Sequence, residues 1–464
     1  MRIKCKKTPA IISGCLVALF FCTNLKAQSS IPSKAQLVWQ QAELGVLISY
    51  DLHVSDGKPY NQAENRISPM EDINIFNPTQ LNTDQWILAT KAAGAKFAVL
   101  TATHETGFAL YQSDVNPYCM KALKFQDGKG DIVRDFVNSC RKYGIKPGIY
   151  LGIRWNSYLG VHDFRIEGES QFVKNRQMAY KKMCEGMVKE LCTRYGELFM
   201  IWFDGGADDP TKYGADVLPI VQQTQPNCLF YHNAQRADFR WGGSESGTVP
   251  YPCWSTFSFP FSHAANKEKV FANDFKLLKN GDSSGKYWMP AMSDAPLRGY
   301  NKGHEWFWEP GNDKYIFPLQ ALVKMYYNSV GHNSTLILGL TPDDRGLLPD
   351  ADVLRLNEFG TEIKKRFENP VAVWKENDPF YTLLIPSGKP MSELVIQENI
   401  EFGEKVRSFL VEALIDNKWE MLAEGSCIGH KYIFVLNTPL LCKKIRLRIL
   451  DSSGAPMIKS FTIY

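Results

Sequence analysis

The strongest chemical signal in the sequence is an aspartate at the end of a short apolar run. Residues 199–203 read Phe-Met-Ile-Trp-Phe, and Asp204 follows them directly, before Gly205 and Gly206. A carboxylate placed at the end of a buried strand can act as a nucleophile or as an acceptor of substrate hydrogen bonds. It can equally be a loop aspartate that caps the next helix or turn. Position alone leaves both interpretations open.

Two further apolar runs lead to side chains that could share the same site. The run at residues 97–101 is followed by His104 and Glu105, and the run at residues 149–153 is followed by Trp155. The carboxyl ends of barrel strands lie at one face, so these side chains are expected to meet there. His104 can instead be a structural histidine whose hydrogen bonds are satisfied within the fold.

Aromatic residues and carboxylates occur together in two later segments. One contains Trp241 and Glu245, and the other, residues 304–309, reads His-Glu-Trp-Phe-Trp-Glu. Aromatic faces stack on the apolar faces of sugar rings, and glycoside hydrolysis needs two carboxylates beside the scissile bond. The pattern therefore favours a carbohydrate site, although any single tryptophan could simply pack a loop onto the fold. The side chains expected to bind substrate are His104, Glu105, Trp155, Trp202, Trp241, Arg298 and Trp306.

A parallel α/β fold would position these side chains. Short runs typical of strands buried on both faces occur at residues 44–49, 96–101, 145–151, 198–203, 228–231 and 335–340. Helical patterns occupy residues 83–93, 131–143, 170–195 and 319–330, and each is followed by a glycine. Repeated strand–helix units over residues 28–367 predict a (β/α)8 TIM-like barrel with long loops.

The pattern changes after residue 367. Helical periodicity stops, and short alternating strands follow at residues 381–384, 393–397, 406–413, 419–424, 431–436 and 444–450. Residues 368–464 are therefore expected to form an all-β sandwich, with the boundary at Glu368-Asn369-Pro370. Trp419 and Tyr432 are too few to indicate a second sugar site, so support of the barrel is the expected role of this domain.

The first 27 residues have the pattern of a secretory signal peptide. Basic residues precede an apolar run at residues 10–22, and Leu25-Lys26-Ala27 offers a small-residue cleavage site. Residues 12–15 resemble a lipoprotein signal, but only a few apolar residues precede them, which disfavours lipidation. The expected location of the mature chain is periplasmic or extracellular.

Removal of this segment changes the meaning of the composition. The chain carries 53 Lys plus Arg and 49 Asp plus Glu, but five basic residues and three of the 11 cysteines lie in the signal. The mature chain is nearly neutral, which disfavours nucleic acid as a partner. No later run is long and apolar enough to predict a membrane span. The eight remaining cysteines are dispersed without a CxxC pair, so neither a zinc site nor a disulfide framework is expected.

Taken together, the motifs resemble those of glycoside hydrolase family 29, the α-L-fucosidases, over nearly the whole mature chain. The most specific match is Ile201-Trp202-Phe203-Asp204-Gly205. Further matches are Phe76-Asn77-Pro78, Asp84-Gln85-Trp86, residues 92–101, Gly130-Asp131-Ile132-Val133, residues 142–150, Ser329-Val330-Gly331-His332-Asn333 and Pro342-Asp343-Asp344-Arg345-Gly346. The resemblance implies a retaining mechanism with Asp204 as nucleophile and no metal or organic cofactor. Nearby donors are expected to keep the pKa of Asp204 low.

The chain departs from the family pattern at several positions of the expected site. Ser49-Tyr50-Asp51 replaces the usual His-Phe-Gly, and Thr103-His104-Glu105-Thr106 replaces Lys-His-His-Asp. In two branches of the family a glutamate serves as acid/base, and the corresponding positions here are Cys253 and Met292. The acid/base must therefore come from another residue.

Glu245 is the candidate acid/base, and Glu305 and Glu309 are the runners-up. A general acid needs an apolar surrounding that raises its pKa, which Trp241 or Trp306 could supply. The resemblance implies a secreted exo-glycosidase that releases terminal α-L-fucose from fucosylated oligosaccharides or glycoconjugates. Two alternatives remain open: a shifted specificity, such as for α-L-galactosides, and a carbohydrate-binding protein on a barrel that has lost catalysis. The sequence does not indicate an oligomeric state.

Overall fold

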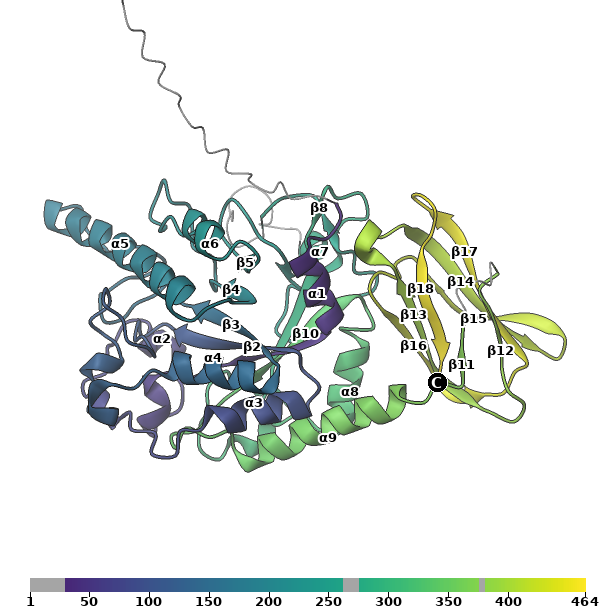
Figure 1. Ribbon diagram of the computed structural model, residues 1–464, viewed down its shortest axis with the longest axis horizontal. Coiled ribbons are helices and arrows are strands. Elements are labelled where there is room, and N and C mark those ends of the chain that lie inside the picture. The colour runs from purple at the N-terminus through teal and green to yellow at the C-terminus, as the bar shows by residue number, and fades with distance from the viewer. Residues whose placement is uncertain (1–29, 262–274, 375–379) are drawn as a thin grey trace, which may run out of the picture.

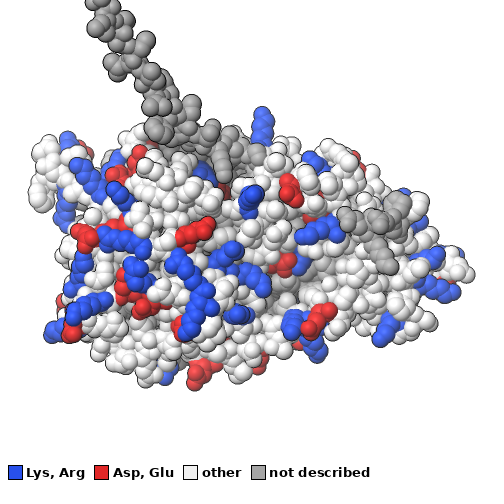
Figure 2. Space-filling view, in the orientation of Figure 1, with Lys and Arg blue, Asp and Glu red and all other residues white. Residues whose placement is uncertain are grey.

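The computed structural model contains a barrel and a β-sandwich that lie side by side (Figure 1). It describes residues 30–261, 275–374 and 380–464, so the predicted signal peptide at residues 1–27 lies outside the described part. Basic and acidic side chains are interspersed over the face that Figure 2 shows. None of the helices in the described ranges is long and apolar enough to cross a membrane.

Eight parallel strands form the barrel in the order β5-β4-β3-β2-β1-β10-β9-β6. Their bounds are Leu44–Ile48 (β1), Phe97–Thr103 (β2), Lys146–Leu151 (β3), Met200–Trp202 (β4), Leu229–Tyr231 (β5), Arg240–Trp241 (β6), Ala291–Pro296 (β9) and Ser334–Leu340 (β10). Asp238, two residues before β6, closes the gap between β5 and β6. The backbone amide of Asp238 donates to the carbonyl of Phe230 at 3.0 Å, and its carboxylate accepts from the amide of Phe230 at 2.7 Å. The predicted (β/α)8-like barrel is confirmed.

Side chains alternate between the inside and the outside of this barrel, because successive residues of a strand point to opposite faces. In β2, Phe97 and Val99 pack inside, whereas Ala98 and Leu100 pack against the helices. The same alternation places Trp202 inside the barrel at the end of β4. At the carboxyl end of each strand, the next residue of the inward-facing row therefore points into the mouth of the barrel.

Most predicted elements are present with small shifts at their ends. The helix α4 (Ile132–Tyr143) begins after Asp131, whose side chain accepts from the amide of Arg134, and ends at Gly144, whose φ of 74° suits glycine. The other predicted helices are α3 (Thr83–Ala92), α5 (Gln171–Arg194) and α8 (Leu319–Tyr327). The expectations did not include α1 (Lys34–Ala42), α6 (Leu218–Thr224), α7 (Phe275–Asn280), α9 (Asp350–Phe367), β6 or β9.

The predicted all-β sandwich is confirmed, and it consists of two antiparallel four-stranded sheets. One sheet has the order β11-β18-β13-β16 and the other β12-β17-β14-β15. Their bounds are Ala372–Val373 (β11), Thr382–Leu384 (β12), Met391–Glu398 (β13), Val406–Ile415 (β14), Lys418–Gly425 (β15), Tyr432–Leu440 (β16), Lys444–Ser452 (β17) and Ile458–Ile463 (β18). Their inner faces enclose a separate apolar core that includes Phe409 and Phe461.

Buried and half-buried polar side chains attach the sandwich to the barrel near the starts of β1 and β10. The carboxylate of Glu43, just before β1, pairs with Lys431 at 2.5 Å and with His430 at 3.0 Å. Asn333, just before β10, donates to Glu404 of the sandwich at 2.6 Å. These contacts lie at the amino ends of the strands, opposite the mouth of the barrel.

One buried carboxyl in the sandwich should make the stability of the protein depend on pH. Oε1 of Glu398 accepts from the amides of Lys405 and Val406, but Oε2 has no hydrogen-bond partner, and burial raises the pKa of Glu398 to about 7. Because the folded state holds this proton more tightly than the unfolded state, stability is lost as pH rises through about 7. We expect Glu398→Gln to exceed wild type in free energy of unfolding by on the order of 2 kcal/mol above that pH.

Urea denaturation at an acidic and at an alkaline pH measures this effect. The difference between wild type and Glu398→Gln should be small in acid and grow as pH rises. The matched control is Glu401→Gln, which changes an exposed glutamate of the neighbouring turn and should give no pH-dependent difference. A gain from Glu398→Gln that is the same at both pH values would contradict the explanation.

Candidate active site

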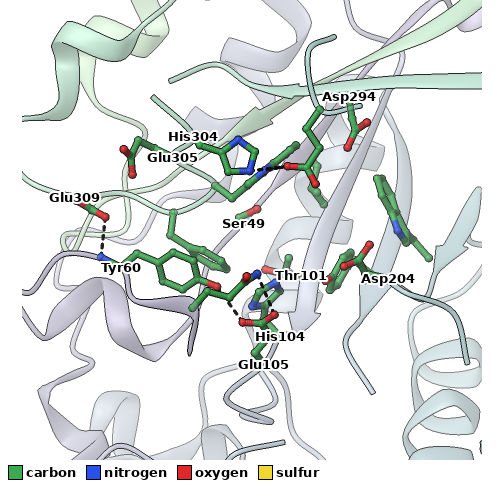
Figure 3. A pocket seen from close by; sticks show the side chains of 17 residues that line it. Ser49, Tyr60, Thr101, His104, Glu105, Asp204, Asp294, His304, Glu305 and Glu309 are labelled. Carbon is green, nitrogen blue, oxygen red and sulfur yellow. Dashed lines mark hydrogen bonds and ion pairs between the residues drawn. The ribbon is translucent and has the colours of Figure 1, made fainter. Parts of the chain in front are cut away.

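A cavity of about 480 Å³ opens at the mouth of the barrel (Figure 3). Its floor is formed by inward-facing residues of the strands, and its rim by loops that follow β1, β2, β6 and β9. The polar and charged residues that line it are Ser49, Tyr60, Gln62, Thr101, His104, Glu105, Tyr150, Asp204, Glu245, Asp294, His304, Glu305 and Glu309. The cavity therefore brings together the carboxylates that the sequence placed on separate segments.

Asp204 continues the inward-facing row of β4 beyond Trp202 and faces the cavity. The chain turns sharply behind it, because Gly205 and Gly206 have φ values of 65° and 86°, a region that favours glycine. A side chain at Gly205 would also approach Arg154 to 2.8 Å. The glycines thus allow the strand to end in a carboxylate that points into the barrel mouth.

The pKa of Asp204 is raised, so the expectation that nearby donors keep it low is wrong. Desolvation by the surrounding barrel is the main cause, although the side chain itself is exposed to the cavity; the charges of Glu245 and Glu105 add to it, while His104 and Arg154 act in the opposite direction. Desolvation and neighbouring carboxylates both disfavour the ionised form. His104 and Arg154 are therefore the groups that favour the anion a nucleophile requires.

Glu245 lies in the loop after β6 and accepts two hydrogen bonds on the same oxygen. Nε1 of Trp306 donates to Oε2 at 2.9 Å, and Nε2 of His304 lies 2.7 Å from Oε2. Burial by itself raises the pKa of Glu245, but these two hydrogen bonds and the charge of His304 lower it overall. The same contact raises the pKa of His304. Glu245 thus has a carboxylate–imidazole pair with His304 in place of the expected apolar surrounding.

The runner-up carboxylates Glu305 and Glu309 lie on the rim, on the side of the cavity away from Asp204 (Figure 3). Burial and the neighbouring charge of Glu309 raise the pKa of Glu305. Glu309 accepts from the backbone amide of Tyr60 at 2.7 Å and from Asn312 at 3.0 Å. Glu309 is therefore engaged in holding the loop after β1 to the rim.

His104 lines the cavity between two aromatic rings. It stacks on Tyr150 with centroids 5.6 Å apart, and the edge of its ring meets Phe307 at 4.8 Å. Burial and the charge of Asp204 raise the pKa of Tyr150. His104 and Tyr150 are thus placed beside the proposed nucleophile.

Glu105 faces the cavity but is largely engaged by the loop after β1. Its carboxylate accepts from Tyr60 at 3.1 Å and from Gln62 at 3.2 Å, and it pairs with Arg66 at 2.7 Å. The guanidinium of Arg66 in turn lies 4.4 Å from the centre of the Trp155 ring. Glu105 therefore shapes the cavity by fixing this loop.

Three residues expected to bind substrate lie outside the lining of the cavity, whereas Trp202 and Trp306 are part of it. Trp155 packs under Arg66. Trp241 donates its indole N–H to Asp294 at 2.9 Å. Arg298 is buried and pairs with Asp352 of α9 at 3.0 Å and with Asp313 at 2.9 Å. Through these contacts the three side chains hold neighbouring residues of the site in place, and they do not face the cavity themselves.

Sequence reasoning missed Asp294 as a residue of the site. It lies in β9 and is directed inward, but β9 has the sequence Ala-Met-Ser-Asp-Ala-Pro and does not form an apolar run. One of the polar residues that interrupt the apolar pattern of this strand, Asp294, is the residue that faces the cavity.

The two positions where branches of the family carry a glutamate lie elsewhere, since Cys253 and Met292 are buried and do not line the cavity. Cys253 instead contacts the buried guanidinium of Arg240 at 3.2 Å.

Within the described residues, no group of three or more His, Cys, Asp or Glu side chains is arranged to hold a metal ion. The cavity combines two carboxylates from different strand ends, aromatic rings and several hydroxyl and imidazole groups, which is an arrangement suited to a sugar.

Comparison with known proteins agrees with this geometry. The family profile of alpha-L-fucosidase matches residues 50–367. Alpha-L-fucosidase 1 of Arabidopsis thaliana is 26% identical over 94% of this chain and 87% of its own length. A crystal structure from Bacteroides thetaiotaomicron, provisionally assigned as an alpha-L-fucosidase, is 57% identical with a TM-score of 0.91, over 94% of this chain and 99% of that chain. A Ruminococcus gnavus family 29 fucosidase, solved as a mutant in complex with fucose, shares the fold at 21% identity, with a TM-score of 0.78 and coverage of 95% and 96%.

Proposed function

The chain belongs to the alpha-L-fucosidase family, glycoside hydrolase family 29, and from this premise we propose that it is a retaining exo-glycosidase. Its proposed reaction is the hydrolysis of terminal α-L-fucosyl residues of oligosaccharides or glycoconjugates. The observation that supports this most is that Asp204 and Glu245 face one cavity from two different strand ends. Two carboxyl groups in one sugar-sized site are the minimum that such hydrolysis requires.

In the first proposed step, Asp204 attacks the anomeric carbon as Glu245 gives a proton to the glycosidic oxygen. The bond from the anomeric carbon to that oxygen breaks, the aglycone leaves as an alcohol, and the fucosyl group is held as an ester of Asp204. In the second step Glu245 accepts a proton from water, and the water oxygen displaces the Asp204 carboxylate. The two inversions restore the α configuration.

The contact between Glu245 and His304 supports the proton transfers. The carboxylate raises the pKa of His304, so the pair retains a proton at a higher pH than a free imidazole would. That proton can pass across the 2.7 Å contact to Glu245 when a leaving oxygen approaches. In the second step the pair can take the proton back from water.

We also propose that the mature protein is exported to the periplasm or the extracellular space. The support is the pattern of the first 27 residues, in which basic residues precede an apolar run and a small-residue cleavage site. Export would bring the enzyme to glycans outside the cytoplasm. Mass spectrometry of the secreted protein should find Gln28 as its first residue.

Proton NMR of the hydrolysis of an aryl α-L-fucoside tests the proposed reaction. We expect α-L-fucose to appear first and the β anomer to grow in later by mutarotation, because a double displacement retains configuration. β-L-Fucose as the first product would exclude the retaining mechanism. The matching aryl α-L-galactoside is the control for specificity, since it adds only a hydroxyl at C6. Faster turnover of the galactoside would assign the site to that sugar, and binding without turnover of either would leave a carbohydrate-binding protein.

A further inference from the structure

The cavity contains a third inward-facing carboxyl group that the proposed reaction does not use. Asp294 lies in β9, is only 5% exposed, and borders the same cavity as Asp204 and Glu245. Figure 3 shows Asp294 and Asp204 on the same side of the cavity, opposite Glu309 and Tyr60. A sugar that places its anomeric carbon at Asp204 would therefore lie within the space that Asp294 borders.

The three carboxyl groups differ in the cations near them. Glu245 pairs with His304, and the charges of His104 and Arg154 favour ionised Asp204. No lysine, arginine or histidine of the described ranges forms an ion pair with Asp294. Its contact is a neutral one, in which Oδ1 accepts the indole N–H of Trp241 at 2.9 Å.

The charged groups that face Asp294 are both acidic. Glu245 approaches from the loop after β6, and Asp204 from the end of β4. On its other side β10, with the sequence Ser-Thr-Leu-Ile-Leu-Gly-Leu, contributes no charged side chain. His304 and Glu305 lie on the rim, with His304 joined to Glu245. A third anion in this place would be desolvated and repelled from two sides, and accordingly burial and these two carboxylates raise the pKa of Asp294 well above its ordinary value.

We propose that Asp294 is a neutral carboxylic acid in the working enzyme and donates its proton in a hydrogen bond to a hydroxyl of the bound sugar. Oδ1 is held by Trp241, which fixes the orientation of the group and leaves the second oxygen to carry the proton. Asp294 is then a substrate-binding donor, and of the three neighbouring carboxyl groups Asp204, Glu245 and Asp294 only two are anions. The identity of the sugar rests on the proposed function, but the protonation of Asp294 does not.

This assignment has a consequence for the pH dependence of binding. Below the pKa of Asp294 the group is neutral and donates to the sugar. As pH rises through that pKa, the donor is lost and a negative charge appears beside two others, so the affinity for the sugar should fall. An asparagine at this position donates through its amide at every pH and has nearly the same shape as the acid.

The experiment compares Asp294→Asn with Asp294→Leu, which has a similar size but no donor. Binding of L-fucose is measured by calorimetry across pH, and thermal unfolding shows that each variant is folded. We expect Asp294→Asn to bind within about 3-fold of wild type near neutral pH and to lose the decline on the alkaline side, whereas Asp294→Leu binds roughly 10- to 100-fold more weakly. If Asp294→Asn weakens binding as much as Asp294→Leu, or keeps the alkaline decline, the proposal is overturned.

Infrared spectroscopy of the unliganded protein provides a test that needs neither fucose nor turnover. Glu398, with a pKa of about 7, contributes its own band of a protonated carboxylic acid near neutral pH. The band of Asp294 should therefore remain at a pH well above 7, be absent there in Asp294→Asn, and be present in Asp204→Asn. If Asp294→Asn does not remove such a band, Asp294 is ionised and the proposal fails, even if the protein is a fucosidase. If wild type shows the band but no fucosidase activity, the proposed function fails while the neutral acid stands.

Should Asp294→Asn be slow only on substrates with poor leaving groups, Asp294 would be the acid/base and the assignment as a binding donor would be wrong.

Discussion

Asp204→Asn should lower kcat for an aryl α-L-fucoside by on the order of 10⁴-fold or more, because the ester intermediate can no longer form. The loss should appear in kcat and in kcat/KM alike, since the carboxylate acts in the reaction and not only in binding. The variant should be about as stable as wild type, because Asp204 is exposed to the cavity and solvent screens its charge.

Azide offers a positive test of the same role. In Asp204→Gly, which lacks the side chain, azide can occupy the space of the missing carboxylate, and the product should be β-L-fucosyl azide. The matched control is Asp208→Asn, which changes an aspartate of the following turn that does not line the cavity and should leave kcat within about 2-fold. Activity of Asp204→Asn at the wild-type rate would remove Asp204 from the mechanism.

Glu245→Gln should show an effect that depends on the leaving group. On a fucosyl oligosaccharide, whose leaving alcohol needs a proton, we expect kcat/KM to fall by roughly 10²- to 10⁴-fold. On an aryl fucoside with an acidic phenol the first step needs little help, so the ester of Asp204 should accumulate and a burst of phenol should precede slow turnover. Azide should accelerate that turnover and give α-L-fucosyl azide, because it attacks the ester from the side normally used by water.

The control for this experiment is the runner-up on the rim. Glu305→Gln changes a carboxyl of the same cavity whose pKa is raised by burial and by Glu309. If Glu245 is the acid/base, Glu305→Gln should alter KM more than kcat and should give no α-L-fucosyl azide. If the burst and the azide product follow Glu305→Gln instead, the roles of the two residues are reversed.

The sequence by itself determined the elements whose signal is local. The strand that leads to Asp204 could be predicted because its residues are apolar on both faces, and α4 because Asp131 and Gly144 mark its ends. The sandwich followed from short alternating strands. The missed strands β6 and β9 show the limit of this reasoning, since β6 has two residues and β9 contains Ser293 and Asp294. A strand that supplies polar residues to a site loses the apolar pattern by which strands are recognised.

The sequence also placed Asp204, His104 and Glu245 as candidates, and the tertiary structure decided which of them meet and in what state. Whether a carboxyl gains or loses its proton depends on groups far along the chain. Glu245 pairs with His304, which lies 59 positions further along the chain, while Asp294 receives only an indole N–H and faces two other acids. Likewise Arg298, expected at the substrate, is drawn to Asp352 in the last helix of the barrel. Residue types and spacing specify where a chain can place a carboxylate, but the charges and the burial that set its pKa arise only when distant segments fold against one another.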